Sequence, residues 1–377
     1  MKLTAKIGLD DLFYIFFYIN VFCKAIGLGN SDVFYYVVLL FGMGMLMTKI
    51  MRDKYSSREV NYVLIMLLVG FLSFILTEKP TLTLTCLCVS GMKNVDLNRL
   101  FRDTFLIRGG SFCVVFALAF FELIDQGRMP MYRNGNYQVR YGMGFDHPNA
   151  LHMAFFLICL SFILFYFENF RWYHALGMLL LNLGVYHYSL SRSGLVLTFF
   201  IVLSALGCTM IKTNGLIYNL ICASPLVVLA LVATFSLLSG LFYGELSVLD
   251  RMNEIFTGRL EYSHYYLTHY GFTLFGNRGI LSDTNALFDN GYIFVYLQYG
   301  LVGVLTWLAL ALNSCFAVIN EKRVEYALAL IALFLYGFSE SYLPNVFLDV
   351  GLLFGCHTIF KKRDPDAHDL HSDLQPQ

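Results

Sequence analysis

Long apolar runs, separated by short polar segments, dominate this chain. A helix needs about 17–25 mostly apolar residues to cross a bilayer, so the runs predict an all-α polytopic integral membrane protein with about 12 transmembrane helices. We expect the short run at 81–93 to borrow residues from its flanks and the long run at 290–319 to project beyond the membrane. The predicted spans cover residues 9–28, 32–49, 60–77, 81–93, 104–124, 148–167, 172–190, 194–211, 215–239, 290–319, 326–341 and 345–360.

Two polar segments are much longer than the other turns, and both fall on the same side of the predicted membrane. They cover 125–147 and about 240–289. Within the second, residues 249–270 space their apolar side chains as a helix does, so we predict a long, partly helical extracytoplasmic loop late in the chain. The spans and loops form a single transmembrane domain over 1–363. The polar tail 364–377 is expected to be disordered in the cytoplasm.

The composition places the chain among membrane proteins and excludes several other classes. Hydrophobic residues make up 58% of the sequence and charged residues 14%. The net charge of zero argues against a nucleic-acid partner. The cysteines lie mostly within apolar runs, where they are typical of small buried residues rather than of a disulfide framework or zinc site. We find no metal-ligand spacing and no nucleotide-binding glycine loop, so neither a metal nor a cofactor is expected.

Basic residues are distributed unequally between the two predicted faces. If the N-terminus lies inside, both termini are cytoplasmic and lysine and arginine occur together on the inner face, as the positive-inside rule expects. The opposite face carries Lys79 as its only lysine but many arginines. Because the guanidinium group is a planar fork suited to phosphate and carboxylate oxygens, this surplus predicts an outward-facing site for a phosphorylated or acidic substrate. The outer arginines are Arg128, Arg133, Arg140, Arg192, Arg251, Arg259 and Arg278.

Three polar motifs stand at the outer ends of predicted spans. They are Gly144-Phe145-Asp146-His147-Pro148-Asn149, with Arg140 just before it, Ser191-Arg192-Ser193-Gly194, and Asp289-Asn290-Gly291-Tyr292. Each would begin a helix at the outer surface, where free N–H groups and the positive end of the helix dipole attract anions. Pro148 fits a first helical position, and Ser193 or Asp289 fits an N-cap. The alternative interpretation is that all three are only helix caps.

Individual side chains support the prediction of an outward-facing anion site to different degrees. Arg192 lies between two spans with almost no loop, where a charge usually has a partner or a function, although it could also extend to lipid headgroups. His147 could be a general base, a hydrogen-bond donor or a cap. Glu340 and Asp349 flank the last outer turn, as functional acids or as partners of arginines. His264 and His269 are alternative bases in the late loop.

Four segments together resemble the Wzy-type polysaccharide polymerases, which belong with the O-antigen ligases in one membrane superfamily. The resemblance runs from about Arg140 to Gly303, and the late position of the long outer loop also fits the family pattern. The segments are GFDHPN, SRSG, GRLEY and DNGYIFVYLQYGLVG.

The resemblance implies a metal-independent glycosyl transfer on the outer face of a bacterial cytoplasmic membrane. A growing glycan would pass from its polyprenyl diphosphate carrier to a hydroxyl of the next lipid-linked repeat unit, and polyprenyl diphosphate would leave. Arg192 and Arg140 would bind the diphosphate with support from Arg259, and His147 would serve as base or orienting group. Further expected substrate contacts are Asp146, Asn149, Ser191, Ser193, Asp289, Asn290, Tyr292 and Tyr262.

The same family implies the partners and leaves two alternatives open. The expected partners are the lipid-linked oligosaccharide, the bilayer, a chain-length regulator and a flippase. A ligase of the superfamily would move a finished glycan to another acceptor with the same chemistry. A flippase for lipid-linked sugars would also need spans and arginines, but it should carry polar residues along both halves of a pathway. Capsule, exopolysaccharide and O-antigen all remain possible products.

Overall fold

A bundle of helices makes up almost all of the computed structural model, which describes residues 8–27, 33–133, 136–211, 213, 215–280 and 288–360. The described residues also form two further complete 3₁₀ helices, Phe167–Asn169 and Val350–Leu353, and one β-hairpin. The helices are α1 (Asp11–Ala25), α2 (Val33–Arg52), α3 (Ser57–Thr77), α4 (Thr81–Ser90), α5 (Leu97–Phe120), α6 (Pro148–Tyr166), α7 (Trp172–Ser189), α8 (Arg192–Cys208), α9 (Leu216–Leu241), α10 (Ser247–Ile255), α11 (Arg259–His269), α12 (Gly291–Glu321), α13 (Val324–Gly337) and α14 (Cys356–Phe360).

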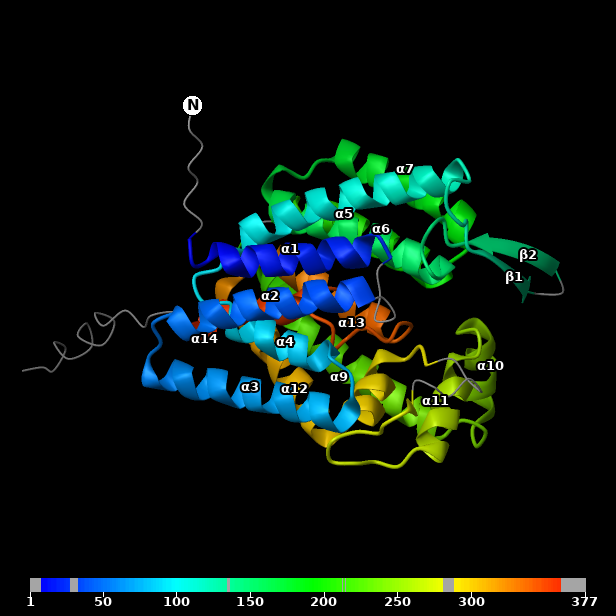
Figure 1. Ribbon diagram of the computed structural model, residues 1–377. Coiled ribbons are helices and arrows are strands. Elements are labelled where there is room, and N and C mark those ends of the chain that lie inside the picture. Colours follow the sequence, from blue (N-terminus) through cyan, green and yellow to red (C-terminus); the bar gives the residue numbers. More distant parts are fainter. Residues whose placement is uncertain are drawn as a thin grey trace, which may run out of the picture.

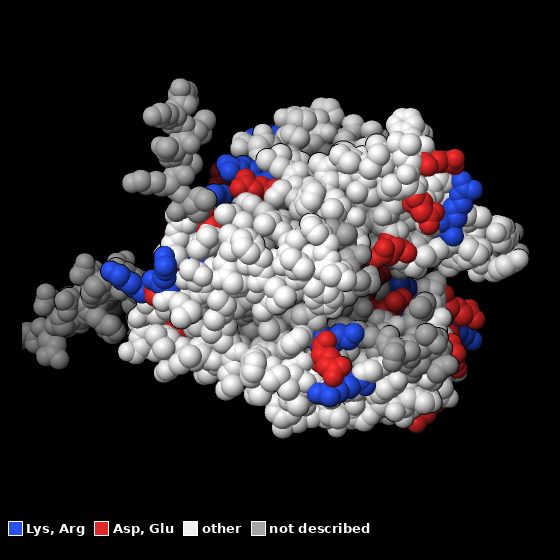
Figure 2. Space-filling model, viewed as in Figure 1, with Lys and Arg blue, Asp and Glu red and all other residues white. Residues whose placement is uncertain are grey.

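The long helices lie side by side, and the hairpin, α10 and α11 project together at one end of the bundle (Figure 1). On the face shown in Figure 2, charged side chains gather toward the two ends, and a broad uncharged band lies between them. Within the described residues, α2, α3, α5, α6, α9 and α12 are long and apolar enough to cross a membrane, judged by length and composition. The chain is therefore a predominantly helical, membrane-embedded protein.

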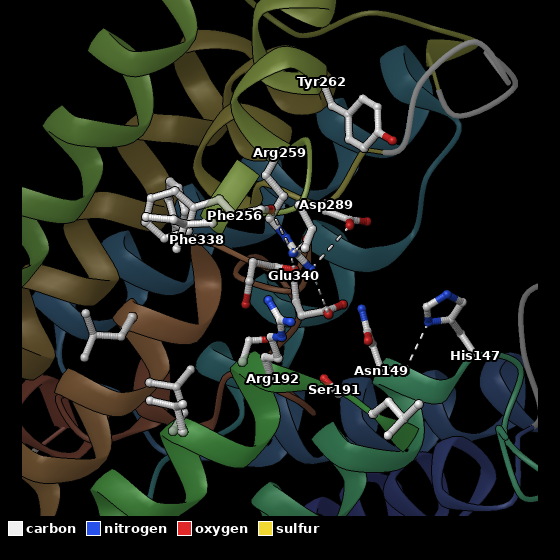
Figure 3. A pocket seen from close by; sticks show the side chains of 18 of the residues that line it. His147, Asn149, Ser191, Arg192, Phe256, Arg259, Tyr262, Asp289, Phe338 and Glu340 are labelled. Atoms are coloured by element: carbon white, nitrogen blue, oxygen red, sulfur yellow. Dashed lines mark hydrogen bonds and ion pairs between the residues drawn. The ribbon is translucent and has the colours of Figure 1, made fainter. Parts of the chain in front are cut away.

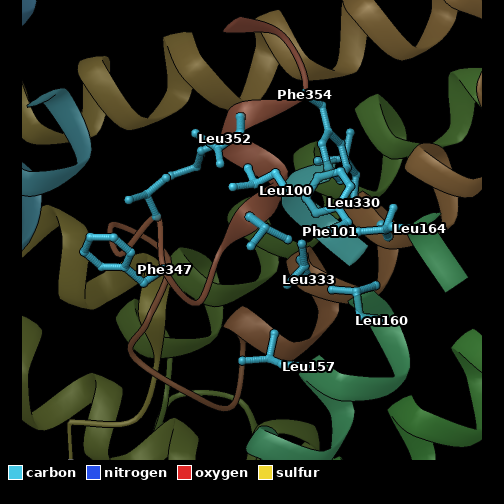
Figure 4. Packing of buried hydrophobic residues seen from close by; sticks show 14 of the residues in the cluster. Leu100, Phe101, Leu157, Leu160, Leu164, Leu330, Leu333, Phe347, Leu352 and Phe354 are labelled. Carbon is cyan, nitrogen blue, oxygen red and sulfur yellow. The ribbon is translucent and has the colours of Figure 1, made fainter. Parts of the chain in front are cut away.

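The interior is built from aliphatic and aromatic side chains contributed by helices far apart in sequence. In Figure 4, Leu100 and Phe101 of α5 meet Leu160 of α6 and Leu330 of α13. Phe354, which follows the 3₁₀ helix Val350–Leu353, closes this cluster, and its ring stacks on Tyr326 at 4.3 Å between centroids. This core holds α6 and α13 side by side. The first turn of α6 and the last turn of α13 both lie at the site described below.

The last apolar run, 345–360, is not the single helix that its hydropathy predicts. It turns irregularly, forms the 3₁₀ helix Val350–Leu353 and becomes helical again only in α14. Irregular backbone is tolerated at membrane depth where protein satisfies its polar groups. Here the Thr85 hydroxyl donates to the Pro344 carbonyl at 2.6 Å and accepts from the Val346 N–H at 3.1 Å. The Arg108 guanidinium donates to the Phe347 carbonyl.

The long run at 290–319 also differs from an uninterrupted helix. Helix α12 breaks at Gly300, whose φ of 65° and ψ of −166° lie outside the helical region. The break leaves two backbone N–H groups without helical partners. Leu301 donates instead to the Thr273 carbonyl and Val302 to the Leu274 carbonyl, each at 3.0 Å. The segment that precedes α12 is thereby bound to the middle of the same helix.

Both long polar segments contain ordered structure. In the first, β1 (Arg128–Arg133) and β2 (Asn136–Tyr141) form an antiparallel hairpin that the sequence pattern did not predict, with Met129 opposite Arg140. In the second, two helices, α10 and α11, occupy the region of helix-like spacing at 249–270. Thr257 and Gly258 separate them, with φ of 56° and 87°. The tail 364–377 lies outside the described residues.

Candidate functional site

A cavity of about 910 Å³ opens where the first turns of α6, α8 and α11 meet the turn that follows α13. In Figure 3, Arg192 and Arg259 point into its centre, with His147 on one side and the rings of Phe256 and Phe338 on the other. Nine of the twelve residues expected to form the site line this cavity, although they come from five separate segments. These are Arg140, His147, Asn149, Ser191, Arg192, Ser193, Arg259, Tyr262 and Asp289.

The first turn of α8 presents unsatisfied hydrogen-bonding groups to the cavity. Ser191, not the predicted Ser193, is the N-cap residue, and its side chain makes no cap hydrogen bond. The residue is only 2% exposed, and its buried hydroxyl has no hydrogen-bond partner in the part of the chain that the structure describes. Among these residues, no capping side chain covers the N–H groups at the start of α8, which are available to an anion.

Buried hydrogen bonds fix the position of this helix end. His152 of α6 bonds through one ring nitrogen to the Ser189 hydroxyl at 2.9 Å and through the other to Asn182 at 2.8 Å. The Ser189 hydroxyl also accepts from the Ser191 N–H at 3.2 Å. The site is therefore held by the side chains of α6 and α7, not by α8 alone.

Of the three arginines that line the cavity, Arg192 has no partner among the described residues. It is the first residue of α8, it is exposed, and it lines the cavity. Within the described part of the chain its guanidinium forms no hydrogen bond or ion pair. An arginine held at a helix N-terminus without a protein partner, beside free N–H groups, is arranged to bind a ligand anion.

The other two arginines of the cavity also hold the structure together. Arg140 of β2 donates to the Ser189 carbonyl at 2.7 Å and to the Asn149 amide oxygen at 2.5 Å, which ties the hairpin to α6 and α7. Arg259 begins α11 and lies 3.6 Å from the Asp289 carboxylate and 4.0 Å from that of Glu340. These contacts bring the segments that carry Asp289 and Glu340 to the start of α11.

His147 serves as the N-cap of α6, and Pro148 is the first residue of that helix, as predicted. Its Nδ1 accepts a hydrogen bond from the Asn149 N–H at 3.1 Å. A neutral imidazole that accepts at Nδ1 carries its proton on Nε2, so this ring is a hydrogen-bond donor at its other nitrogen. Burial lowers the pKa of His147, assisted by the charge of Arg140. The geometry favours an orienting role over that of a base.

Two carboxyl groups share the Arg259 side of the cavity. Burial raises the pKa of Asp289, although the positive charges of Arg259 and Arg140 oppose the shift. Glu340 lies in the turn beyond the end of α13, where burial and then the neighbouring Asp289 charge raise its pKa to about 8. Glu340 is therefore predominantly protonated at neutral pH, whereas Asp289 is the ionised partner of Arg259.

Three expected substrate contacts lie elsewhere. Asp146 is exposed and does not line the cavity. Asn290, not the predicted Asp289, caps α12, where its side chain accepts from the N–H groups of Tyr292 and Ile293. The Tyr292 hydroxyl donates to the Phe334 carbonyl at 2.8 Å inside the bundle. The two α12 residues therefore position the segment that carries Asp289 and face away from the cavity.

The alternative bases and the remaining outer arginines have local partners or lie on the surface. His264 bonds to the Gly240 carbonyl at 2.8 Å, and His269 stacks on Tyr265. Arg128 pairs with Glu122, and Arg278 with Glu78. Arg251 is exposed on α10, and the side chain of Arg133 lies outside the described residues. No three His, Cys, Asp or Glu side chains within the described ranges could together hold a metal ion.

The apolar half of the cavity was not predicted. It is lined by residues of α8, α9, α10 and α13 and of the turns that follow α10 and α13, and both α8 and α9 pack against α13. Sequence could not reveal it, because its residues have the same composition as the lipid-facing side chains beside them. The main apolar lining residues are Val196, Leu197, Val232, Phe235, Ile255, Phe256, Leu335 and Phe338.

Comparisons with protein-family models, with curated proteins and with solved structures found no match to this chain.

Proposed function

We propose that the protein polymerises lipid-linked oligosaccharide repeat units into a surface polysaccharide. The observation that carries this proposal is the two-sided chemistry of the cavity. One end offers an uncapped helix N-terminus and three arginines, and the other end is lined by aliphatic and aromatic side chains. A polyprenyl diphosphate carrier has the same two-sided chemistry, because its charged diphosphate joins an apolar tail to a sugar.

The charged end supports a role in bond cleavage as well as binding. A diphosphate gains negative charge at its bridging oxygen as the anomeric carbon–oxygen bond breaks. Arg192 and the N–H groups of α8 would stabilise that charge more strongly in the transition state than in the bound substrate. Arg140 and Arg259 already interact with protein groups. They would therefore contribute positive charge from fixed positions and would not change conformation to bind the ligand.

The apolar end supports a lipid-linked rather than a water-soluble donor. Val196 of α8, Val232 of α9 and Leu335 of α13 all line the cavity, and α8 and α9 both pack against α13. The apolar part of the cavity is therefore bounded by these three helices. Burial of a prenyl chain there would stabilise the complex by roughly 25 cal/mol for each Å² of apolar surface removed from water.

The proposed topology follows from the charge pattern. About 12 spans, with both termini in the cytoplasm, would place the cavity on the outer face of a bacterial cytoplasmic membrane. The described helices and the uncharged band between the charged ends are compatible with that arrangement (Figure 2). The chain-length regulator and flippase remain proposed partners.

The two alternatives differ in what they require of the cavity. A ligase would use the same donor site, so nothing in the geometry distinguishes it. A flippase would need polar side chains along the whole path across the membrane. Arg108, Gln298 and Asp349 are buried within the bundle, but none lines this cavity. The one-ended distribution of charge in the cavity favours an enzyme over a flippase.

The size distribution of lipid-linked and surface glycan in a deletion strain tests the function. Single repeat units that reach the outer face without being joined would support the polymerase. Long chains that remain unattached to their final acceptor would point to a ligase. Repeat units retained on the inner leaflet would point to a flippase and overturn the proposal.

A further inference from the structure

We propose that Asp289 accepts the proton of the attacking acceptor hydroxyl and that Glu340 is its positioning partner. This inference rests on the proposed function and deepens it, because it identifies the base of the transfer reaction. His147, the candidate that the sequence suggested, has a different role in this geometry.

Asp289 and Glu340 meet at a single nitrogen atom. Asp289 Oδ2 lies 3.6 Å and Glu340 Oε1 lies 4.0 Å from Nη2 of Arg259 (Figure 3). Two carboxyl groups that share one cation do not both ionise readily, because like charges at close range repel. The side chain of Asp289 is 29% exposed and that of Glu340 only 19%. Asp289 is therefore the more accessible of the two from the cavity.

The surroundings assign the charge to Asp289. Burial gives Glu340 a pKa of about 8, so this group holds its proton at neutral pH. Asp289 lies closer to the Arg259 guanidinium, at 3.6 Å against 4.0 Å, and is more exposed, so the ionised form is assigned to Asp289. The charged or titratable groups that face Asp289 are Arg259 of α11, His147 before α6, Arg140 of β2 and Glu340 beyond α13. Arg192 of α8 lines the same cavity. An ionised carboxylate with a raised pKa is suited to general-base catalysis near neutral pH.

His147 is poorly placed to accept the proton. Its Nδ1 already accepts the Asn149 N–H at 3.1 Å, and its Nε2 carries a hydrogen in the neutral ring. To act as a base it would have to protonate Nδ1 and lose the cap of α6. Glu340 is protonated and so cannot accept a proton at neutral pH. Of the two carboxyl groups that line the cavity in the described residues, Asp289 is the one assigned the ionised form and the one more accessible.

A separate observation indicates where the reacting groups lie. Ser191 is only 2% exposed and lines the cavity, and its buried hydroxyl has no hydrogen-bond partner among the described residues. Such a buried group is costly unless a ligand satisfies it. It lies at the uncapped N-terminus of α8, beside Arg192. The leaving diphosphate is thus assigned to the α8 side and the base to the α11–α12 side of one cavity.

The step is balanced without any further reactant. The acceptor hydroxyl oxygen forms a bond to the anomeric carbon of the donor while its proton passes to Asp289. The bond between that carbon and the diphosphate oxygen breaks, and its electron pair leaves with the diphosphate at Arg192. Attack and departure on opposite sides would invert the anomeric configuration. The proton on Asp289 is then released to water at the open side of the cavity.

The test combines turnover with binding in the full-length protein. We expect Asp289→Asn to lower the polymerisation rate about 100- to 10,000-fold, the usual contribution of a general base. Binding of farnesyl diphosphate, used as the probe of the anion site, should stay within threefold of wild type. Asp289→Glu should recover part of the rate and shift the acidic limb of its pH profile. His147→Asn is the comparison, because asparagine also caps helices, and we expect it to lose less than tenfold.

Three outcomes would overturn the inference. Asp289→Asn could retain more than a tenth of the wild-type rate, or it could lose farnesyl diphosphate binding in proportion to rate. Alternatively, His147→Asn could lose more activity than Asp289→Asn. Failure of the proposed function has a different signature, because wild-type protein would then neither bind farnesyl diphosphate nor extend a lipid-linked repeat unit. That result removes both proposals.

Discussion

What distinguishes Arg192 from the other arginines around it is that it has no partner in the part of the chain that the structure describes. Arg259 faces two carboxyl groups, Arg140 binds a carbonyl and an amide oxygen, and Arg128 pairs with Glu122. A guanidinium group already engaged stabilises the fold, and its removal leaves buried acceptors unpaired. Arg192 has no such cost, so its loss should affect the ligand more than the protein.

The raised pKa of Glu340 predicts a pH-dependent stability. Its ordinary pKa is 4.5 and its folded value is about 8, so protonated Glu340 contributes stability that is fully present below pH 4.5 and is lost as pH rises through about 8. Glutamine does not titrate. We therefore expect the thermal midpoint of Glu340→Gln, relative to wild type, to rise between pH 5 and pH 8.5 in detergent solution.

The exposed carboxylate Glu122 supplies the control for that measurement. Its side chain is 69% exposed, and Glu122→Gln should follow wild type at both pH values. A constant difference between Glu340→Gln and wild type across the range would contradict the environment assigned to Glu340.

At this scale the sequence identified most of the cavity but not the role of each group. Arginines and polar residues before apolar runs can be recognised from charge and position, which is how Arg192, Arg140 and Ser191 were found. Which serine caps α8, and which nitrogen of His147 is occupied, depend on backbone angles that no pattern encodes. Asn290 and Tyr292 look like site residues in sequence because they adjoin Asp289, but α12 turns them inward.

Among the elements, α8 is the one whose placement decides the site. Gly194, in its first turn, allows the helix to approach His152 closely, because an added Cβ would lie 2.4 Å from the imidazole ring. The ring cannot easily yield, since both of its nitrogens are hydrogen-bonded to α7. The close approach of α6 and α8 therefore requires glycine.

Gly194→Ala should displace the start of α8. We expect a loss of about 1–3 kcal/mol in stability from overpacking, together with reduced turnover. Gly207→Ala on the same helix is the matched control, because an added Cβ there meets nothing within 4 Å. That variant should equal wild type or gain up to about 1 kcal/mol from its helix propensity. Equal thermal midpoints for the two variants would contradict the packing described for α8.

The break in α12 gives a second prediction for an element. An added Cβ at Gly300 would lie 2.4 Å from the Gly276 nitrogen, and the residue has a positive φ. Gly300→Ala should therefore release the segment that binds the Leu301 and Val302 N–H groups. We expect faster proteolysis within residues 271–280 than in wild type, with Gly44→Ala, where an added Cβ meets nothing within 4 Å, as control. Unchanged cleavage would contradict this coupling.

Apolar runs predicted the long helices well, since a run of sufficient length has few other stable forms in a membrane. The same signal failed at 345–360, because hydropathy cannot distinguish a spanning helix from an irregular segment buried inside the protein. The hydrogen bonds of Thr85 that stabilise this segment link positions far apart in sequence, because Thr85 and Pro344 are 259 residues apart. The hairpin was missed because β1 shows no regular alternation of apolar and polar residues, and the alternation in β2 covers only the six residues Asn136–Tyr141.

For the whole molecule, the proposed topology predicts that the two charged ends differ in their accessibility from outside the cell. Tyr132 of the hairpin is 77% exposed, and the Arg102 side chain, near the start of α5, is 58% exposed. If the cavity faces outward, Tyr132→Cys should react with a membrane-impermeant maleimide in intact spheroplasts. Arg102→Cys should react only after lysis. Both variants need Cys113→Ala as background, because Cys113 is exposed in the described part of the chain. The reverse pattern of labelling would invert the proposed topology.

The glycan made by a deletion strain that carries Arg192→Ala tests the central claim most directly. Wild type and Arg128→Ala, an exposed arginine outside the cavity, serve as controls, with each protein quantified in the membrane. We predict that Arg192→Ala lowers polymerisation about 100- to 1000-fold, so that single repeat units accumulate, as expected when one donor to a developing anion is removed. Arg128→Ala should restore the wild-type size distribution. Full-length polymer in the Arg192→Ala strain would contradict the assignment of this cavity to the diphosphate.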